Sequence, residues 1–421
     1  MTFIRSYLTK NQRTVVPFFA AIVAFCTYSC MYAFRKPFAA ATFQGAEAFG
    51  IQLKIVLVIA QLIGYTLSKF VGIRFISEIK HHHRARGIFI LLCLAALALL
   101  FFALLPTPYN VFFMFLNGIP LGLIWGLVFS YLEGRRATEF MGSVLAISFI
   151  FSSGFVKSVG KWLMENGTTE AWMPFQTGML FLLPAALFIF LLEQIPPPSK
   201  YDQEHRSERA PMTKKERKDF LDHYFFGIVV LVISYVLLSV LRDFRDSFAA
   251  DIWKELGVNS AAIFTTTEVP ISLAVLLCMS LLTFIHHNRK AVLINHVLVI
   301  FGFLITGFST LAYANALIEP TWWMILNGLG LYLAYIPFNV VFFERLIAAA
   351  RKPANVGFLM YISDSFGYLG SIFVMLYKNF GQSAMSYRSF FINALGAASV
   401  LGTGLMVISF FYFNQKLKVK V

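Results

Sequence analysis

Residues 28–40, with the sequence YSCMYAFRKPFAA, end an apolar run that begins near Val15 and carry two adjacent cations. The run is long enough to cross a bilayer, where a charge costs about 2.5–3.5 kcal/mol, so the cations mark a site. Tyr28, Tyr32 and Arg35 follow one another at i, i+4 and i+7, which places two hydroxyls and a guanidinium on one helical face. That face suits an oxyanion, because a planar guanidinium grips it and phenols orient it. The alternative is an arginine that reaches the far interface beside two interfacial tyrosines.

The whole chain has the composition of a helical membrane protein. Hydrophobic residues make up 58% of its 421 residues and charged residues only 13%. Twelve apolar runs approach the length of about 20 residues that a spanning helix needs, and they are continuous rather than alternating, which excludes a transmembrane barrel. We therefore expect an all-α polytopic membrane protein with twelve transmembrane helices. The runs cover approximately residues 14–40, 52–76, 87–106, 110–132, 140–163, 174–193, 224–249, 261–285, 291–313, 321–343, 355–378 and 388–413.

Lysine and arginine predict the orientation. With the N-terminus in the cytoplasm, 24 of the 35 cations fall in inside segments and five in outside segments. This asymmetry places both termini in the cytoplasm, in the cell membrane and, for a bacterium, the inner membrane. It also explains the net charge of +14 without nucleic acid, because the charge lies on short loops that face an anionic leaflet. The five outside cations are Lys54, Lys161, Lys254, Lys378 and Arg388.

One long polar segment divides the spans into six and six. Residues 194–222 are proline-rich and then charge-rich, which is typical of a semi-flexible cytoplasmic linker between an N-terminal half at 1–193 and a C-terminal half at 223–421. The halves share short motifs at one offset of 210 residues: RKPFAA at 35–40 matches RDSFAA at 245–250, and LNG at 116–118 matches LNG at 326–328. With six spans in each half, the two halves are predicted to be parallel pseudo-repeats.

Charges within the spans indicate an anionic substrate. The cations are Arg35, Lys36, Lys69, Lys157, Arg242 and Arg245, and the acids are Asp243, Asp246, Glu268 and Asp364, which leaves a residual charge of +2. Arg35 and Arg245 occupy corresponding positions in the two repeats, and we predict that both bind the anionic substrate. A structural quartet is the alternative for the second half, because Arg242 and Asp246 have i, i+4 spacing and can pair.

Other polar residues fall on predicted spans at positions that face a site. Tyr65 and Lys69 are spaced i, i+4 in the second span, where a lysine at the cytoplasmic boundary is the alternative. Lys157 in the fifth span either lines a cavity or reaches outward. Asp364 and Glu268 are candidate proton carriers, because desolvation favours a protonated carboxyl, or they are counter-ions to a cation. The four cysteines lie in apolar runs and predict neither a disulfide nor a metal site.

Six plus six spans joined by a basic linker resemble the major facilitator superfamily over the whole chain. Within it, Tyr28-x3-Tyr32-x2-Arg35-Lys36-x-Phe38 and Gly64-Tyr65-x2-Ser68-Lys69-Phe70 resemble the organophosphate:phosphate antiporter family, as a divergent member. The resemblance implies that Arg35 and Arg245 grip phosphate and that Tyr28, Tyr32, Tyr65 and Lys69 line the pore. Phe151 stands nearest the place where that family has a phosphate-binding histidine, so anion transport is expected and the exchange of phosphate is left open.

We therefore expect a secondary transporter that moves a small organic anion, with a phosphate ester as one candidate, by alternating access. The expected partners are the anionic substrate, the lipid bilayer, and protons or inorganic phosphate as counter-substrate, with the protein a monomer. The predicted substrate-binding residues are Arg35, Arg245, Lys69, Tyr28, Tyr32, Tyr65, Arg242 and Lys157, and the coupling or counter-ion residues are Asp364, Glu268 and Asp246. Two alternatives remain: a proton-coupled transporter of a sugar or zwitterion, and a non-transporting sensor or scaffold. No nucleophile and base pair, phosphate loop or ligand set predicts an enzyme, a cofactor or a metal.

Overall fold

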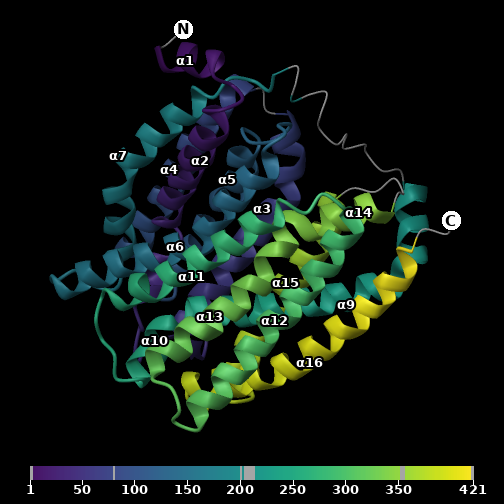
Figure 1. The fold of residues 1–421 in the computed structure, drawn as a ribbon. Helices are drawn as coiled ribbons and strands as arrows, with labels where there is room; N and C mark the ends of the chain where they lie inside the picture. The colour runs from purple at the N-terminus through teal and green to yellow at the C-terminus, as the bar shows by residue number, and fades with distance from the viewer. Residues whose placement is uncertain (1–2, 79–80, 200–201, 203–213, 351–355, 419–421) are drawn as a thin grey trace. The chain divides into compact units, whose positions relative to one another are not determined.

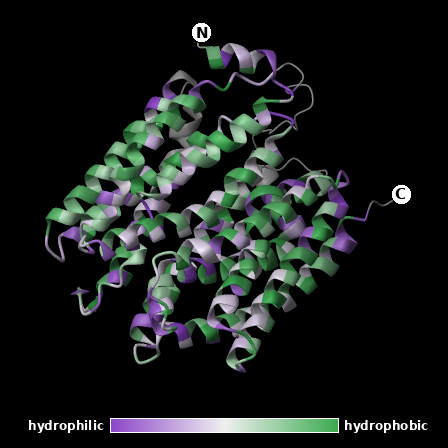
Figure 2. Cartoon of the chain, turned by 60° about the vertical axis from the view of Figure 1, so that its left-hand side comes forward, coloured by the Kyte–Doolittle hydropathy of each residue, from purple (hydrophilic) through white to green (hydrophobic). Residues whose placement is uncertain are grey.

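The computed structural model describes all residues except 1–2, 79–80, 200–201, 203–213, 351–355 and 419–421, and the chain is built almost entirely of helices (Figure 1). Each of the twelve predicted apolar runs falls on a helix, so the predicted all-α polytopic class is confirmed. Nine helices of the described residues are long and apolar enough to cross a membrane, and the other three runs lie on α2, α3 and α15. Figure 2 shows hydrophobic residues along the helix bodies and hydrophilic residues mainly at their ends.

The described residues divide into two compact units. The first holds those of Met1–Arg206, Asp246–Thr266 and Asn379–Gly381, and the second holds those of Ser207–Arg245, Thr267–Lys378 and Gln382–Val421. Residues 246–266 thus group with the first unit, although the seventh apolar run, 224–249, extends into them. Of the predicted linker 194–222, residues 200–201 and 203–213 lie outside the described residues. The predicted halves 1–193 and 223–421 stay a prediction.

The first unit contains most of the helices of the first half of the chain. Proline stands in the first turn of α2 and of α7, where its missing N–H would have no helical partner. A two-residue turn, with positive φ at Phe49 and Gly50, joins its short antiparallel strands. The elements are α1 (Phe3–Lys10), α2 (Val16–Tyr32), η1 (Pro37–Ala40), β1 (Glu47–Ala48), β2 (Ile51–Gln52), α3 (Leu53–Glu78), α4 (His81–Leu104), α5 (Asn110–Phe129), α6 (Thr138–Glu165), α7 (Met173–Glu193) and α10 (Ala249–Glu255).

Helices α3 and α5 pack backbone against backbone. A Cβ atom at Gly118 would lie 2.8 Å from the backbone nitrogen of Tyr65, and one at Gly122 would lie 2.7 Å from the Tyr65 carbonyl oxygen. A Cβ atom at Gly64 would collide with the carbonyl of Phe115. Small residues at such crossings let membrane helices approach closely and gain van der Waals contact. The contact fixes the position of α3, which carries Tyr65 and Lys69.

The second unit contains the remaining helices. Its first helix, α9, departs from helical geometry at Tyr224, where φ is −113° and ψ is 15°. A π-helical turn, η2, follows Pro337, and such turns are frequent at functional sites. The elements are α9 (Lys214–Ser247), α11 (Ile263–Leu282), α12 (Asn288–Ala314), α13 (Pro320–Pro337), η2 (Phe338–Phe342), α14 (Phe343–Ala350), α15 (Val356–Phe380) and α16 (Tyr387–Lys416), and α9 and α11 end or begin within the first unit.

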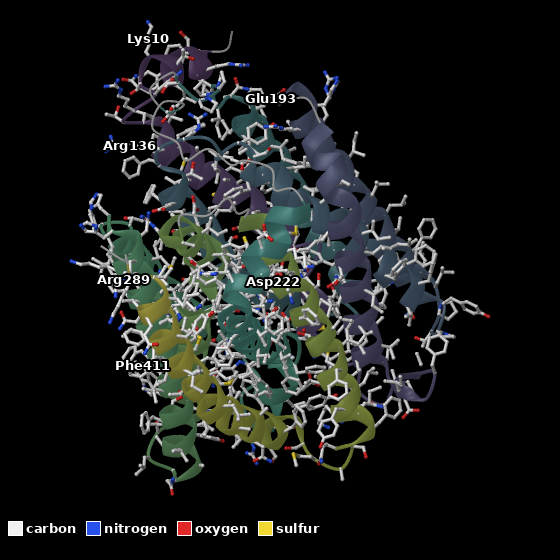
Figure 3. The ribbon with its side chains drawn as sticks, turned by 90° about the vertical axis from the view of Figure 1, so that its right-hand side faces the viewer. Lys10, Arg136, Glu193, Asp222, Arg289 and Phe411 are labelled. Carbon is white, nitrogen blue, oxygen red and sulfur yellow. The ribbon has the colours of Figure 1, made fainter. Side chains whose placement is uncertain are left out.

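Polar residues gather at one end of the first unit. Lys10, Arg136 and Glu193 lie toward this end in Figure 3. Here the Arg135 guanidinium donates to the carbonyl oxygen of Pro196. The Asp202 carboxylate accepts hydrogen bonds from the backbone N–H of Arg136 at 3.2 Å and from the Ser199 hydroxyl at 2.7 Å. These bonds hold the start of the segment after α7 against the loop that joins α5 to α6.

Candidate functional site

Arg35 lies in the turn after α2, stacked on tyrosine rings of the first unit. Its guanidinium carbon is 3.9 Å from the centroid of the Tyr65 ring and 5.9 Å from that of Tyr32. A guanidinium over an aromatic face gains about 0.5–1 kcal/mol when exposed and about 2 kcal/mol when desolvated. The stacking also fixes the plane of the fork, which sets the direction in which its N–H groups point.

The other predicted residues of the first two spans lie around this arginine. The Tyr28 and Tyr32 rings meet edge to face at 5.5 Å, as i, i+4 spacing on α2 predicts. The Lys69 ammonium is 5.4 Å from the Tyr65 ring centroid, so α3 brings a second cation to the same group. Tyr28, Tyr32, Arg35, Tyr65 and Lys69 therefore form one set of neighbours, which we call the Arg35 cluster.

Two residues that the site prediction did not include support the Arg35 cluster. The Gln61 amide donates to the carbonyl oxygen of Arg35 at 3.0 Å and to Asn117 Oδ1 at 2.8 Å. Asn117 Nδ2 in turn donates to the carbonyl oxygen of Phe34 at 3.1 Å. Side-chain amides thus satisfy carbonyls that the end of α2 leaves without helical partners. The glutamine falls at i, i+4 before Tyr65, a spacing that marks it as a member of the same face.

Trp125 of α5 also belongs to this region. Its ring centroid lies 5.1 Å from that of Tyr28, with an interplanar angle of 72°. The sequence offered no signal for this contact, because it joins helices that are distant along the chain.

A buried carboxylate with two lysines lies in the same unit. The Asp246 carboxylate pairs with the ammonium groups of Lys36 and of Lys157, the latter at 2.7 Å, and accepts a hydrogen bond from the Ser153 hydroxyl. Lys157 is 2% exposed and Asp246 is 8% exposed. Lys157 therefore reaches Asp246 and does not extend to an interface. The alternative pairing of Asp246 with Arg242, which helical spacing permits, is not the one that the structure shows, because Asp246 pairs with the two lysines.

A second ion pair joins α3 to α10. Lys54 Nζ lies 2.5 Å from Asp251 Oδ2 and also donates to the carbonyl oxygens of Ala39 at 3.2 Å and Ala41 at 2.7 Å. Lys54 is 2% exposed, so its three donors are used within the protein. Burial raises the pKa of the Asp251 carboxyl although the Lys54 ammonium opposes the shift. The two pairs, at Asp246 and Asp251, bind residues 246–251 firmly to the first unit.

In the second unit, Arg245 is held by hydrogen bonds from three directions. Its guanidinium donates to Glu268 Oε1 at 2.6 Å, to Asn327 Oδ1 at 3.1 Å and to the carbonyl oxygen of Met324 at 3.1 Å. Arg245 is 3% exposed and Glu268 is 6% exposed. The environment differs from that of Arg35, which stacks on rings.

Arg242 pairs with its neighbour in sequence. Its guanidinium lies 2.6 Å from Asp243 Oδ1 and 4.0 Å from the Tyr335 ring centroid. Asp243 Oδ2 also accepts a hydrogen bond from the Ser371 hydroxyl at 2.8 Å. The pair is therefore braced by α13 and α15.

Asp364 lies beside two tyrosine hydroxyls. Tyr235 of α9 donates its hydroxyl to Asp364, and its oxygen is 3.1 Å from the Tyr335 hydroxyl oxygen. Ser239 follows Tyr235 by four residues on α9 and Ser363 directly precedes Asp364 on α15; both hydroxyls are buried, and within the described residues neither has a hydrogen-bond partner. Asp364, Tyr235 and Tyr335 thus form a hydrogen-bonded polar group within the spans, which we call the Asp364 group.

No group of three or more metal-ligating side chains occurs among the described residues. The polar groups described above are cations, carboxylates, amides and hydroxyls. Such groups bind a small polar solute or carry a proton.

The chain matches a family model and resembles solved transporters. The model, described as a family of unknown function (DUF5690), matches residues 37–416. No curated protein matches the sequence. The peptide transporter POT superposes with a TM-score of 0.62 at 14% identity, covering 96% of this chain and 95% of that one. The xylose transporter XylE from E. coli superposes with a TM-score of 0.59 at 14% identity, covering 94% of this chain and 98% of that one. The nucleoside transporter NupG superposes with a TM-score of 0.55 at 15% identity, covering 96% of this chain and 100% of that one.

These likenesses establish the fold. A solved xylose symporter among them carries the description major facilitator superfamily, so the predicted major facilitator fold is confirmed. At identities of 14–17% the likeness extends to the fold alone. The narrower resemblance to organophosphate:phosphate antiporters stays a prediction.

Proposed function

The chain belongs to the DUF5690 family, and we propose that it is a secondary transporter that moves a small organic anion across a membrane by alternating access. The fold supports transport, because the peptide, xylose and nucleoside transporters that it resembles carry small solutes. Their three different substrates leave the solute class open. The charge within the spans supports an anion.

The observation that carries the proposal is the Arg35 cluster, in a unit whose spans are rich in cations. Among the charges that the sequence places within the spans, the first unit has four cations and one acid. The cations are Arg35, Lys36, Lys69 and Lys157, and the acid is Asp246. An excess of cations over acids within membrane spans favours an anionic solute, because charge in a membrane is costly. A solute with a carboxylate or phosphate supplies the opposing charge, which leaves with it on release.

The Arg35 cluster has the donors that an oxyanion needs. The guanidinium offers a planar fork that matches two oxygens of a carboxylate or phosphate, and Lys69 adds a compact charge. Tyr28, Tyr32 and Tyr65 offer hydroxyls as well as apolar ring faces, so they accommodate the organic part of the solute. Phosphate esters are the candidate class that the resemblance of these residues favours.

Ligand-dependent stabilisation of the purified protein tests the proposal. Organic phosphates, dicarboxylates, amino acids and sugars are screened by thermal shift, because a ligand that binds the folded state raises its stability by mass action. Hydrogen bonds to charged groups contribute about 1.5–3 kcal/mol, so Arg35→Lys should weaken binding of the stabilising anion about tenfold to a hundredfold. Lys10→Gln removes an exposed charge outside the spans and is the matched control.

Uptake of the same anion into proteoliposomes then separates transport from binding. Arg35→Lys should lose uptake while the protein still inserts, and the control variant should keep it. A protein that binds an anion without ever moving it would be a sensor or scaffold. Stabilisation by neutral sugars alone would contradict the anion proposal.

The Asp364 group favours a second candidate, proton-coupled transport of a sugar or zwitterion. A carboxyl that shares a hydrogen bond with Tyr235 can exchange its proton within the spans. Asp364→Asn mimics the protonated acid. If Asp364 carries the coupling proton, this variant should exchange substrate but fail to accumulate it against a gradient. Uphill uptake at the parental rate would eliminate the coupling role.

A further inference from the structure

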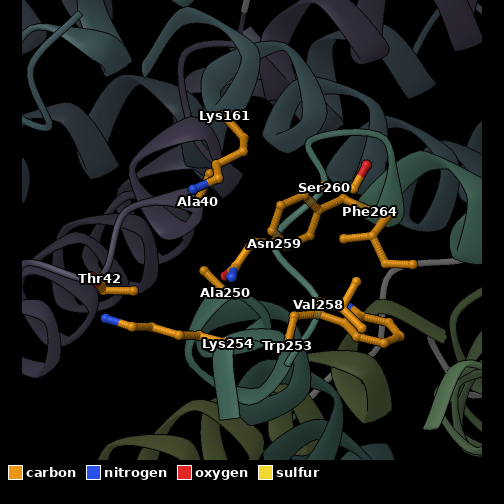
Figure 4. Close-up of a pocket in the computed structure, with 11 residues that line it drawn as sticks. Ala40, Thr42, Lys161, Ala250, Trp253, Lys254, Val258, Asn259, Ser260 and Phe264 are labelled. Carbon is orange, nitrogen blue, oxygen red and sulfur yellow. The ribbon is translucent and has the colours of Figure 1, made fainter. Parts of the chain in front are cut away.

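A small pocket of about 140 Å³ lies in the first unit, and none of the residues that line it belongs to the Arg35 cluster (Figure 4). Its walls come from the end of α6, from η1 and the residues after it, and from α10 with the segment that leads into α11. The polar side chains that line it are Thr42, Lys161, Lys254, Asn259 and Ser260. An engineered cavity of about 150 Å³ holds benzene, so the pocket has room for one compact group.

The two lysines give the pocket a positive charge. In Figure 4 both side chains extend toward the segment that carries Ala40 and Thr42. Lys254 Nζ donates to Gln44 Oε1 at 2.6 Å, which leaves two of its three N–H groups for a ligand. Neither lysine forms an ion pair with any residue that the structure describes, and no aspartate or glutamate is among the lining residues.

Two carboxylates near the pocket, Glu170 and Asp251, already have partners within the protein. Glu170 Oε1 accepts hydrogen bonds from the backbone N–H groups of Thr42 at 3.0 Å and Phe43 at 3.2 Å. Asp251 on α10 pairs with Lys54 at 2.5 Å. These acids are therefore committed to the walls, and an external anion is the natural partner for Lys161 and Lys254.

The walls of the pocket are held in place before any ligand arrives. The Lys54–Asp251 pair anchors α10, and Thr265 bonds to the Ser158 hydroxyl through its backbone N–H at 3.1 Å and its hydroxyl at 2.7 Å. These bonds fasten both ends of the segment that carries Lys254, Asn259 and Ser260. Preorganised donors lower the entropic cost of binding.

The distribution of charge along the sequence makes the two lysines unusual. Lys161 and Lys254 are two of the five cations that the sequence places outside, against 24 inside. Membrane proteins carry few lysines on that side. Two of them in one pocket, on segments distant in sequence, indicate a site that uses positive charge.

We propose that this pocket binds a compact anionic group, a phosphate or carboxylate, with Lys161 and Lys254 as its charge partners. The hydroxyls of Thr42 and Ser260 and the amide of Asn259 line the pocket as further donors. The group belongs either to a soluble anion or to the headgroup of an anionic lipid, since both present the same oxygens. The site is distinct from the Arg35 cluster and does not depend on the proposed transport.

Lysine footprinting of the full chain tests the site residue by residue. The protein is placed in phosphatidylcholine nanodiscs, treated with an amine-reactive reagent, and analysed by mass spectrometry with sodium phosphate or with sodium chloride at equal ionic strength. A bound anion slows modification by the factor 1 + [L]/Kd, which is about tenfold at about ten times Kd. Lys161 and Lys254 should be protected, and exposed Lys10 should react equally in both salts.

A second set of nanodiscs identifies the source of the anion. Protection by phosphate in phosphatidylcholine assigns the site to a soluble anion, and protection by phosphatidylglycerol without phosphate assigns it to a lipid headgroup. Lys254→Gln should raise the phosphate or phosphatidylglycerol content that half-protects Lys161 about tenfold, because one charged partner is lost. The proposal would be overturned if Lys161 and Lys254 each reacted at the same rate with and without phosphate, and with and without phosphatidylglycerol.

Discussion

Replacement of Arg245 and Glu268 by methionine, singly and together, tests whether Arg245 has a structural role or binds substrate. The two side chains meet at 2.6 Å and are almost fully buried. Removing one partner of a buried ion pair costs about 3–5 kcal/mol, because the other charge stays in the interior. Glu268→Met and Arg245→Met should therefore each destabilise the protein by about that amount.

The double variant Arg245→Met/Glu268→Met should lose far less than the sum. It buries no charge, and replacing a buried ion pair by apolar side chains is often neutral or stabilising by about 1–4 kcal/mol. It also lacks two further bonds of the Arg245 guanidinium, to Asn327 and to the carbonyl of Met324, each worth about 1.5–3 kcal/mol. We therefore expect a net loss of about 2 kcal/mol, against about 6–10 kcal/mol for additive effects. A structural role predicts this non-additivity.

Denaturant unfolding of the purified variants, followed by tryptophan fluorescence, measures the double-mutant cycle. Arg289→Met is the control, because Arg289 bonds to an amide, Asn414, and should cost only about 1 kcal/mol. Additivity within about 0.5 kcal/mol would refute the structural role. A stable double variant that no longer binds the stabilising anion would instead support the substrate role that the sequence predicts for Arg245.

Three further predictions concern other parts of the molecule. Asp246→Asn should destabilise the first unit by about 3–5 kcal/mol, and adding Lys157→Met should recover part of that loss in the same unfolding assay; equal stability of the single and double variants would contradict the pairing. Gly118→Ala should lower the thermal midpoint, since overpacking costs about 1–3 kcal/mol, whereas Gly404→Ala in an open part of α16 should be neutral or gain about 0.5–1 kcal/mol; equal midpoints would refute the close helix contact. Burial raises the pKa of Asp202, but hydrogen bonds from Ser199 and Arg136 outweigh burial and lower that pKa. The stability that ionised Asp202 contributes is therefore present above about pH 4 and is lost as the pH falls. The thermal midpoint of Asp202→Asn should differ from that of the parent at neutral pH and converge with it in acid, as midpoints measured across pH will show.

The sequence predicts what depends on local spacing. Helical periodicity alone places Tyr28 near Tyr32, and the length of the apolar runs alone predicts the helices. Residues at i, i+4 and i+7 share a face whatever the rest of the chain does. The membrane-spanning class and its fold therefore follow from composition and pattern.

Contacts between helices are where prediction from the sequence ends. Asp246 has i, i+4 spacing to Arg242, yet its partners are Lys36 and Lys157, which lie far away in the chain. Trp125 packs against Tyr28 of the Arg35 cluster through a contact between helices, which no local pattern encodes. Spacing places Gln61 on the face of Tyr65, but it does not predict the bond of Gln61 to the carbonyl oxygen of Arg35. Which of several equally spaced charges pair is decided by the packing of helices, and a single sequence does not specify that packing.

The glycine contact between α3 and α5 has a consequence for how substrate preference can change. With backbone atoms of the two helices touching, α3 has no slack to slide or rotate beneath Tyr65 and Lys69. If Tyr65 and Lys69 bind the solute as we propose, selectivity can change by exchange of those side chains, but a one-residue insertion between Tyr65 and Lys69 would turn the lysine by about 100° relative to the tyrosine and move it off their shared face. The contact between α3 and α5 thus fixes the backbone, and directed evolution aimed at new substrates should exchange the side chains that α3 carries.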